Sequence, residues 1–359
     1  YYFDFNIFSH DNQIPIHSIF CTGNVQGQTY KMPHNESPSN LTTYDKITQN
    51  VVESITDAEI RTLAESPLDK RAYVGFEPSG VLHLGHMLTA NKLIDLQEVG
   101  MKIVVLLADL HAYLNGKGSL EEIQHTAEIM QKQFIAYGLD EGQTEFVHGS
   151  DFQLEKEYIL DLHKLGTLVT LNRANRAMAE IQSGDVPKVS QAVYPIMQTL
   201  DMHYLDLDLA VGGTDQRKVH VLARELLPEL GYSPCPMIHT PILSNLTTGI
   251  GKMSSSVGTT ISMEDSQESL HKKINKAFCP PTATPPEDQD GNNPENPVLQ
   301  IFQFHIFPRF EQITVERKDK HGGTITYNSY ADLEHDLESG NLYPQDAKEL
   351  SCGYEYCWR

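Results

Sequence analysis

The sequence has few cysteines, no long apolar run and no leader pattern, and each absence removes a class of protein. The five cysteines among 359 residues form no C-x-x-C pair, and their odd number favours a reducing compartment over a disulfide scaffold. The best apolar run, residues 103–107, is far shorter than the ~18–20 residues that a membrane-spanning helix needs. The first 30 residues lack a basic stretch followed by an apolar one, so no secretory signal is indicated. Together these absences predict a cytoplasmic protein without a membrane segment.

Basic residues are also scarce, with 27 Lys and Arg against 48 Asp and Glu and a formal net charge of −21. Taken alone, this acidity disfavours nucleic acid as a partner, because phosphates are repelled by a negative surface. An acidic surface also keeps a protein hydrated when concentrated salt screens its charges. The charge therefore predicts a halophilic archaeal host.

Composition divides the chain into three parts. Residues 1–40 lack periodicity and the first methionine is Met32, so we expect a disordered extension, a misassigned start or a short surface segment. Residues 41–262 carry the pattern of a catalytic domain, and residues 263–359 form a smaller C-terminal domain. Within the latter, a Pro-rich stretch at 280–297 predicts a linker or surface insertion. The tail from residue 351 has no helical period, so no amphipathic helix is expected there.

Strands and helices alternate through the second part. Apolar strands are expected at residues 72–76, 102–108, 146–147, 207–211 and 237–240, and helices at 55–63, 86–99, 120–137, 155–183, 189–204 and 216–227. The third part predicts a strand at 324–327 and a helix at 330–339. This alternation is typical of an α/β fold with a doubly wound parallel sheet. Because ligands of such sheets lie beyond the carboxyl ends of the strands, the loops after Phe76, Ala108 and Val211 are of most interest.

A glycine-rich loop, GFEPSGVLHLGH at residues 75–86, follows the first of these strands and opens a helix. Free N–H groups at a helix N-terminus favour an anion such as a triphosphate. The imidazoles of His83 and His86 can donate to phosphate oxygens as negative charge builds. A tight turn with surface histidines would give the same string. A zinc site is disfavoured because no third ligand recurs nearby.

A second polar loop, GKMSSSVG at residues 251–258, places Lys252 beside three consecutive serines. An ammonium group and hydroxyls on a hinged loop can close over phosphates and release them afterwards. Alone, this string is more typical of a flexible polar loop. Both strings, in this order across one α/β sheet, are improbable by chance and predict a nucleotide site.

Polar side chains recur on one face of the helix expected at residues 189–204. Tyr194, Gln198 and Asp201 are spaced by four and three residues, which places them on the same face. Gln216 opens the next helix, and Asp215 offers a carboxylate for ribose hydroxyls or for a helix cap. These groups would hydrogen-bond a phenol, although an amphipathic core helix explains the pattern equally well.

The HLGH and KMSSS strings resemble the two signature motifs of class I aminoacyl-tRNA synthetases. Residues 44–346 resemble tyrosyl-tRNA synthetases of the archaeal and eukaryotic type through YVGFEPSGVLHLGH, LLADLHAYLN, YPIMQTLDMHYLDLDLAVGGTDQRKVHVLAREL and GKMSSS. The resemblance implies a Rossmann-like, HUP-type catalytic domain, a mostly helical anticodon-binding domain and a homodimer. It also implies a tyrosine–tRNA ligase that forms tyrosyl-adenylate from L-tyrosine and ATP with Mg²⁺, releasing pyrophosphate. The tyrosyl group then passes to the 3′-terminal adenosine of tRNA(Tyr) for protein synthesis.

The resemblance further implies roles for individual residues, with no metal ion held by the protein. Catalytic roles fall to His83, His86, Lys252, Ser254 and Ser255. ATP contacts fall to Gly75, Gly85, Gly212, Gly213, Asp215, Met253 and Ser256. Tyrosine contacts fall to Tyr73 and Asp201 at the hydroxyl, to Tyr194, Gln198 and Gln216 at the α-amino group, and to Glu77.

RNA contacts are implied in the same way. Arg176, Arg217 and Lys218 match positions that meet the acceptor end of the tRNA. Asp346 matches the residue that reads the guanine at the first anticodon position, and His321 falls where an aromatic residue stacks on that base. Basic clusters such as Arg173 with Arg176 are usually solvated faces. A local basic stripe is nevertheless enough for RNA whatever the net charge.

Three other readings share some of these features. A tryptophanyl-tRNA synthetase has the same fold and both signatures, but it does not need Asp201 together with Tyr73. A nucleotidyltransferase of the H-x-G-H type would share only the first loop. A non-catalytic RNA-binding paralogue usually loses one signature, whereas both are intact here.

Overall fold

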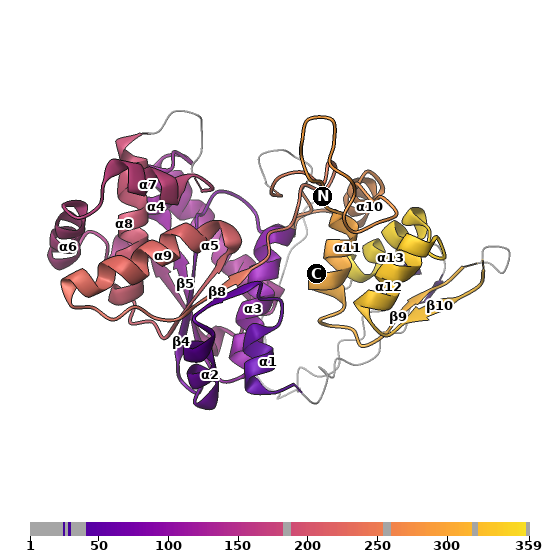
Figure 1. Ribbon diagram of the computed structural model, residues 1–359, viewed down its shortest axis with the longest axis horizontal. Helices are drawn as coiled ribbons and strands as arrows, with labels where there is room; N and C mark the ends of the chain where they lie inside the picture. The colour runs from indigo at the N-terminus through magenta and orange to yellow at the C-terminus, as the bar shows by residue number, and fades with distance from the viewer. Residues whose placement is uncertain are drawn as a thin grey trace, which may run out of the picture.

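The computed structural model describes residues 24–25, 28–29, 41–181, 188–253, 260–317 and 322–356. Within residues 1–40 it gives a short antiparallel pair, β1 (Asn24–Val25) and β2 (Gln28–Thr29), and the rest of the predicted extension lies outside the described residues. Figure 1 shows a sheet flanked by helices and, beside it, a smaller and mainly helical unit. In the part of the chain that is described, no helix is both long and apolar enough to span a bilayer.

The larger unit is built on a six-stranded sheet in the order β3-β8-β7-β4-β5-β6. Five of the strands, β4 (Arg71–Phe76), β5 (Lys102–Leu107), β6 (Thr144–His148), β7 (Leu209–Gly213) and β8 (Met237–Thr240), are parallel. The edge strand β3 (Glu53–Ile55) pairs antiparallel with β8. The α/β fold with a doubly wound parallel sheet is thus confirmed, with one antiparallel strand added.

Helices cover both faces of the sheet. Val74 of β4 packs in one core cluster with α3 (Leu84–Glu98) and α5 (Leu120–Tyr137). Its neighbour Tyr73 packs in another cluster with α8 (Val189–Tyr204) and α9 (Arg217–Leu226). Successive side chains of a strand point to opposite faces, so burial on both faces explains why β4 and β5 are almost continuously apolar.

Two expectations for helices are wrong. The helix expected at residues 155–183 is divided into α6 (Lys156–Gly166) and α7 (Leu171–Met178), because Thr170 caps α7 by accepting a hydrogen bond from the N–H of Arg173. The tail does continue as a helix, α13 (Pro344–Tyr356), which packs along α10 (Gln267–Asn275). Its small residues Ala347, Ser351 and Cys352 are buried at helical spacing, so the signal there is small size rather than an apolar stripe.

The C-terminal unit contains α10, α11 (Pro297–Ile301), the π-helix η6 (Phe302–Ile306), α12 (Tyr330–Ser339) and α13. Strands β9 (Ile313–Val315) and β10 (Ile325–Tyr327) form a hairpin within it. As expected, residues 280–296 form neither helix nor strand, but Asn296 at their end is buried and caps α11. Phe302 and Ile306 belong to the same core cluster as α3, so the two units share a continuous core. The short helices α1 (Thr43–Thr48), α2 (Asp57–Glu65) and α4 (Asp109–Leu114) complete the larger unit.

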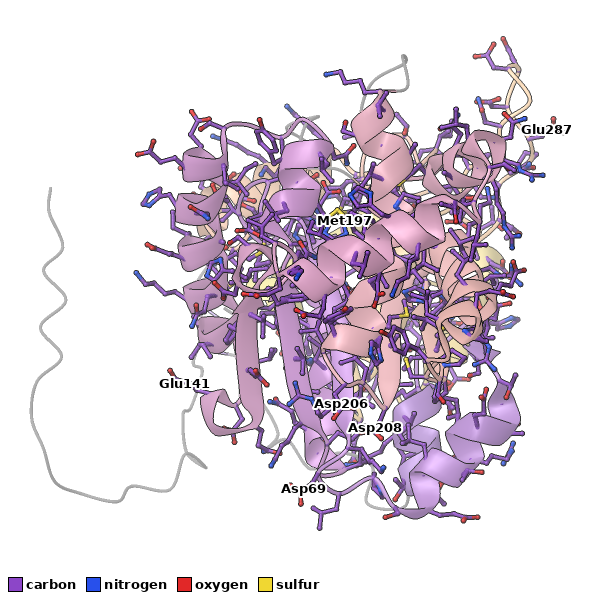
Figure 2. The ribbon with its side chains drawn as sticks, turned by 90° about the vertical axis from the view of Figure 1, so that its left-hand side faces the viewer. Asp69, Glu141, Met197, Asp206, Asp208 and Glu287 are labelled. Carbon is purple, nitrogen blue, oxygen red and sulfur yellow. The ribbon has the colours of Figure 1, made fainter. Side chains whose placement is uncertain are left out.

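Carboxylates gather where the central strands begin. Figure 2 shows Asp69, Asp206 and Asp208 together at the lower edge of the sheet. Asp208 accepts a hydrogen bond from the N–H of Arg71 at 2.9 Å and pairs with the amino group of Lys70 at 2.9 Å. This acidic group lies at the amino ends of β4 and β7, which leaves their carboxyl ends, at the opposite edge, to the functional site.

Candidate active site

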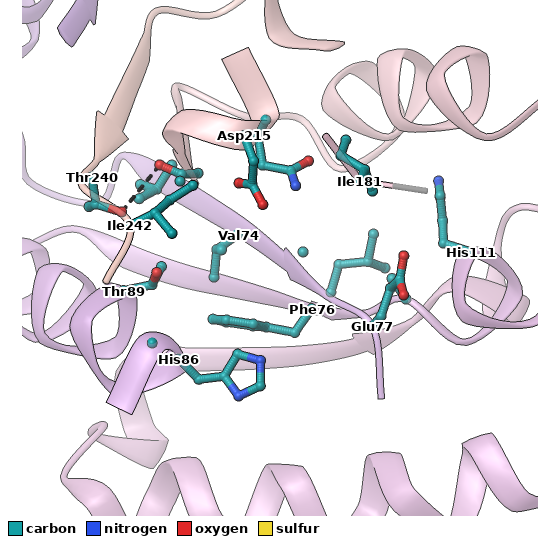
Figure 3. A pocket seen from close by; sticks show the side chains of 18 of the residues that line it. Val74, Phe76, Glu77, His86, Thr89, His111, Ile181, Asp215, Thr240 and Ile242 are labelled. Carbon is teal, nitrogen blue, oxygen red and sulfur yellow. Dashed lines mark hydrogen bonds between the residues drawn. The ribbon is translucent and has the colours of Figure 1, made fainter. Parts of the chain in front are cut away.

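A cavity of about 270 Å³ opens where β4 and β7 end, at the point where the chain connections run in opposite directions. Segments far apart in the sequence meet there. In Figure 3, His86 lies at one end of the cavity, Glu77 and His111 at the other, and Asp215 opposite the strands. The predicted residues that line the cavity are Tyr73, Gly75, Glu77, His83, Gly85, His86, Tyr194, Gln198, Asp201, Gly212, Gly213, Asp215, Gln216, Lys252 and Met253.

The other predicted residues lie elsewhere. Ser254, Ser255, Ser256 and His321 fall outside the described residues. Arg176 is on α7, Arg217 and Lys218 are in the first turn of α9, and Asp346 is in the first turn of α13 in the C-terminal unit. None of these four lines the cavity.

The floor of the cavity carries a buried carboxylate, that of Asp201. Its Oδ1 accepts hydrogen bonds from Gln153 Nε2 at 2.7 Å and from the Tyr158 hydroxyl at 2.8 Å. Its Oδ2 has no hydrogen-bond partner among the described residues, and His111 Nε2 stands 3.6 Å away, too far for a hydrogen bond. Burial raises the pKa of Asp201 to about 7 and lowers that of His111 to about 4, so the imidazole is neutral. Asp201 Oδ2 is therefore able to accept a hydrogen bond from a ligand.

Tyr73 and Gly75 stand on the same face of β4, next to this carboxylate. A Cβ atom at Gly75 would lie 2.7 Å from the Tyr73 hydroxyl oxygen, so a glycine is required for the phenol to keep its place. Burial, reinforced by the charge of Asp201, raises the pKa of Tyr73 well above its usual value. The group therefore remains a hydroxyl that can donate and accept.

Acceptor oxygens also gather at the end of the cavity marked by Glu77. Glu77 Oε1 accepts from the Tyr194 hydroxyl and from Asn115 Nδ2, both at 2.9 Å. Burial raises the pKa of Glu77, while Lys117, whose amino group is 3.8 Å from Oε2, acts in the opposite direction. Gln198 Nε2 donates to Gln216 Oε1 at 3.1 Å, and Gln198 Oε1 has no partner among the described side chains. Such a group of oxygens suits a substrate ammonium group.

The two signature histidines stack with ring centroids 3.8 Å apart. His83 Nδ1 accepts from the N–H of Gly85 at 3.1 Å, and His86 Nδ1 accepts from the N–H of His83 at 3.4 Å. Burial lowers the pKa of His83 to about 4 and that of His86 well below its usual range. Both rings are therefore neutral with the proton on Nε2, which leaves two N–H donors without a backbone acceptor in the described parts of the chain.

Lys252 stands half-exposed at the mouth of the cavity. Its amino group lies 3.3 Å from Asp215 Oδ2 and donates to the carbonyl oxygen of Glu180 at 3.0 Å. Gly213 lies beside Asp215, where a Cβ atom would be 2.8 Å from Asp215 Oδ1. Lys252, Asp215 and the backbone of Gly213 thus lie together. An ammonium group for phosphate and a carboxylate for ribose hydroxyls suit a phosphorylated nucleoside.

Two of the predicted RNA-contacting residues, and the neighbouring Arg173, already have acidic partners. Arg217 pairs with Glu53 at 2.7 Å, Lys218 pairs with Glu180 at 2.6 Å, and Arg173 pairs with Glu225. A phosphate that reached these residues would have to share or displace those carboxylates. The basic stripe expected from the sequence is thus largely neutralised before any RNA binds.

Several residues that line the cavity or hold its carboxylates were not predicted from the sequence. Gln153, Tyr158 and His111 surround Asp201, while Asn115 and Lys117 contact Glu77. His111 and Asn115 lie in the LLADLHAYLN string, so a signal for them was present. Gln153 and Tyr158 carry no motif, and the fold alone brings them to Asp201. Among the described His, Cys, Asp and Glu side chains, no cluster of three could hold a metal ion.

Comparison with known proteins places this site in a family. The family model for class I tRNA synthetases (W and Y) matches residues 68–351. The chain belongs to this family. It is 61% identical over 311 residues to a tyrosine–tRNA ligase of Halorubrum lacusprofundi, covering 87% of this chain and 95% of the relative. A tyrosine–tRNA ligase of Halobacterium salinarum is also 61% identical, over 308 residues that cover 86% of this chain and 93% of the relative.

Solved structures of the synthetase family agree. Tyrosyl-tRNA synthetase of Archaeoglobus fulgidus, complexed with L-tyrosine, superposes with a TM-score of 0.81 and 49% identity, covering 88% of this chain and 96% of that one. A tryptophanyl-tRNA synthetase of Aeropyrum pernix, at 20% identity and a TM-score of 0.64, shares the fold. The expected membership of the class I synthetases is confirmed, and the organisms of the sequence relatives agree with the predicted halophilic archaeal host.

Proposed function

We propose that this synthetase is a tyrosine–tRNA ligase, which activates L-tyrosine with ATP and transfers the tyrosyl group to tRNA(Tyr). One observation carries the proposal. A single cavity joins a buried carboxylate oxygen of Asp201, which has no partner among the described residues, to the two neutral histidines and the lysine of the signature motifs. The names of its relatives support the same activity.

Tyrosine is recognised by its hydroxyl at Asp201. The phenol donates to Asp201 Oδ2 and contacts the Tyr73 hydroxyl, while the α-amino group binds near Glu77, Tyr194, Gln198 and Gln216. A substrate without the hydroxyl leaves Asp201 Oδ2 unpaired, which costs ~1–3 kcal/mol. Tyrosine is thereby preferred over phenylalanine and over tryptophan, because neither of them has a hydroxyl to donate to Asp201.

Adenylation requires no nucleophile from the protein, because the carboxylate of tyrosine is ionised at neutral pH. It attacks the α-phosphorus of ATP, the bond to pyrophosphate breaks, and tyrosyl-adenylate forms. His83 and His86 donate from Nε2, and Lys252 places its ammonium group near the phosphates, so charge developing on their oxygens is stabilised. Asp215 binds the ribose hydroxyls, and Gly75, Gly85, Gly212, Gly213 and Met253 form the wall against ATP.

Mg²⁺ enters with ATP as part of the substrate. The ion would be held by phosphate oxygens and would supply charge on the pyrophosphate leaving group. The roles of Ser254, Ser255 and Ser256 at these phosphates remain predictions from the sequence.

Transfer of the tyrosyl group requires two RNA sites. Arg176 on α7, and Arg217 and Lys218 on α9, receive the acceptor end, and the last two exchange their acidic partners for phosphates. Asp346, which lies 3.8 Å from Arg317 Nη1, reads the anticodon together with His321. We therefore assign catalysis to residues 41–262 and anticodon binding to residues 263–359. Protein synthesis places this reaction in the cytoplasm.

A homodimer is the form we propose for the enzyme. Leu160 and Leu171, on α6 and α7, are 52% and 69% exposed, and Val189 at the start of α8 is 83% exposed. In Figure 1, α6 and α7 lie on the side of the sheet unit away from the C-terminal unit, so a second copy can cover them. Leu160→Asp with Leu171→Asp should convert the dimer to a monomer in analytical ultracentrifugation. Sedimentation of the unaltered protein as a single 40.4 kDa chain would contradict the proposal.

The activity is tested by ATP–pyrophosphate exchange with each amino acid across a wide range of KCl concentrations. We expect exchange with tyrosine. Exchange that depends on tryptophan would instead support a tryptophanyl enzyme. Binding of tRNA without exchange for any amino acid would support a non-catalytic paralogue.

A further inference from the structure

The hairpin that presents Lys252 runs from Leu243 to Met253. Its two limbs are joined by hydrogen bonds from the N–H of Met253 to the carbonyl of Leu243, at 2.7 Å, and from the N–H of Asn245 to the carbonyl of Gly251, at 2.9 Å. Ser244 and Lys252 face each other as a bridge between these limbs. The position of Ser244 therefore sets the position of the Lys252 backbone.

Ser244 is held by a residue of the C-terminal unit. It is buried, and both its N–H and its hydroxyl donate to Gln300 Oε1, at 2.9 Å and 2.8 Å. The amide nitrogen of Gln300, on α11, donates in turn to Glu295 Oε2 at 2.6 Å. The side chain of Gln300 thus makes three hydrogen bonds and has its orientation fixed by Glu295.

The turn of the hairpin also packs against the C-terminal unit. The N–H of Glu295 donates to the carbonyl of Gly249 at 2.9 Å, and the N–H of Phe278 donates to the carbonyl of Leu246 at 2.8 Å. Gly249 has φ of +70°, and a Cβ atom there would collide with the carbonyl of Glu295 and lie 2.7 Å from the Phe278 ring. The hairpin is therefore clamped from the C-terminal side along its length.

The helix of the first signature motif is held by the same part of the C-terminal unit. Arg309 donates to Asn91 Oδ1 of α3, which also accepts from the Tyr137 hydroxyl at 2.7 Å. In Figure 1, α11 lies on the side of the C-terminal unit that faces α3. The segment from Glu295 to Arg309 therefore contacts both proposed phosphate-binding elements, the hairpin that carries Lys252 and helix α3.

We propose that Gln300 is a positioning residue for Lys252, holding the hairpin so that the ammonium group stays beside Asp215, where ATP binds. The inference deepens the proposed function and rests on it, since the proposed function gives Lys252 its place at the phosphates. Removing the amide of Gln300 leaves the N–H and hydroxyl of Ser244 without an acceptor. The hairpin then loses its register on α11, while the tyrosine pocket around Asp201 is untouched.

The test compares Gln300→Leu, which keeps the side-chain volume, with unaltered enzyme in ATP–pyrophosphate exchange. We expect kcat to fall about fivefold or more, because the free energy of one to two net hydrogen bonds corresponds to a rate change of that size. The KM for tyrosine should stay unchanged. Gln312→Leu is the matched control, because Gln312 bonds to Asn328 in the same unit without contacting the hairpin. An unchanged kcat for Gln300→Leu, or an equal fall for both variants, overturns the proposal.

A reciprocal exchange provides the rescue. In Glu295→Gln/Gln300→Glu, the new carboxylate can accept from Ser244 and the new amide can donate to it, so all three hydrogen bonds are kept with the roles exchanged. We expect kcat to recover in this double variant, whereas Gln300→Glu alone places two carboxylates together and stays impaired. Failure to recover would indicate that general packing, not these bonds, is what Gln300→Leu removes.

A double-mutant cycle with Lys252→Ala separates this inference from the proposed function. If Gln300 acts through Lys252, adding Gln300→Leu to Lys252→Ala should lower kcat no further. A further fivefold fall would overturn the inference and leave the role of Lys252 standing. If Lys252→Ala by itself leaves exchange unchanged, the proposed role of the lysine fails first.

Discussion

Tyrosine binding should depend on pH through Asp201, and Asp201→Asn should remove that dependence. Burial raises the pKa of this carboxyl from 3.8 to about 7, while Oδ2, the oxygen proposed to meet the substrate phenol, has no partner among the described residues. The phenol donates to the ionised form. Tyrosine therefore competes with a proton for Asp201, and binding lowers the pKa of the carboxyl.

The magnitude follows from the position of this pKa. With half of Asp201 protonated near pH 7, binding at that pH releases about half a proton, and affinity falls about tenfold from pH 8 to pH 6. The surrounding groups do not titrate in this range: burial holds the pKa of both His83 and His111 at about 4 and keeps Tyr73 and Tyr158 protonated. Glu77 also lines the described cavity, and burial raises its pKa, so its titration is the alternative source of a pH dependence.

The assay is isothermal titration with tyrosine at pH 6, 7 and 8 and fixed KCl, in two buffers of different ionisation enthalpy. In Asp201→Asn the amide oxygen still accepts from Gln153 and Tyr158, so the pocket keeps its shape. This variant should bind tyrosine about tenfold more weakly at pH 8, and its affinity should be flat with pH. The amide nitrogen then stands where Oδ2 was, so the phenol loses its charged acceptor and can only accept a hydrogen bond from a neutral amide. A flat profile in the unaltered enzyme would refute the reasoning. A slope that survives in Asp201→Asn would assign it to Glu77.

Three further outcomes are expected. Lys252→Ala should lower the rate of tyrosine-dependent exchange at least ~tenfold while tyrosine affinity in the same titration stays nearly intact, because the lysine meets only the phosphates; unchanged exchange would remove it from the mechanism. Gly75→Ala should raise the KM for tyrosine, because the added Cβ would lie 2.7 Å from the Tyr73 hydroxyl oxygen, with kcat for exchange as the internal comparison; an unaltered KM would show that Tyr73 can shift freely. Exchange activity should persist above ~1 M KCl, where screening removes repulsion among the excess carboxylates; a maximum at low salt with collapse above that concentration would contradict a halophilic host.

The elements that could be predicted from the sequence are those in which local pattern and burial agree. The helices Leu120–Tyr137 and Tyr330–Ser339 and the strand Met237–Thr240 match the expected residues, because a cap residue marks both ends of each helix and a proline flanks both ends of the strand. The pattern failed where tertiary packing overrides it. The helix from Pro344 to Tyr356 carries small residues instead of an apolar stripe, and its contact with α10 stabilises it.

The residues of the candidate site divide in the same way. Motif and helical spacing were enough to find His83, His86, Lys252 and the face of Tyr194, Gln198 and Asp201, because each set is local in the chain. The hydrogen bonds from Gln153 and Tyr158 to Asp201 join residues more than forty positions apart, and no local signal records them.

The sequence by itself determined the fold class, the two signature loops and the family to which they belong, since these depend on periodicity and on short strings. Tertiary structure alone decided the state of each group in the site. Burial makes the histidines neutral donors and leaves Asp201 with a pKa of about 7 and an open acceptor. Tertiary structure also decided which charges are paired. Arg217 and Lys218 on α9 form ion pairs with carboxylates, which a count of charges could not show. The physical reason is that solvation and pairing depend on neighbours in space, which the fold brings together and the order of residues does not.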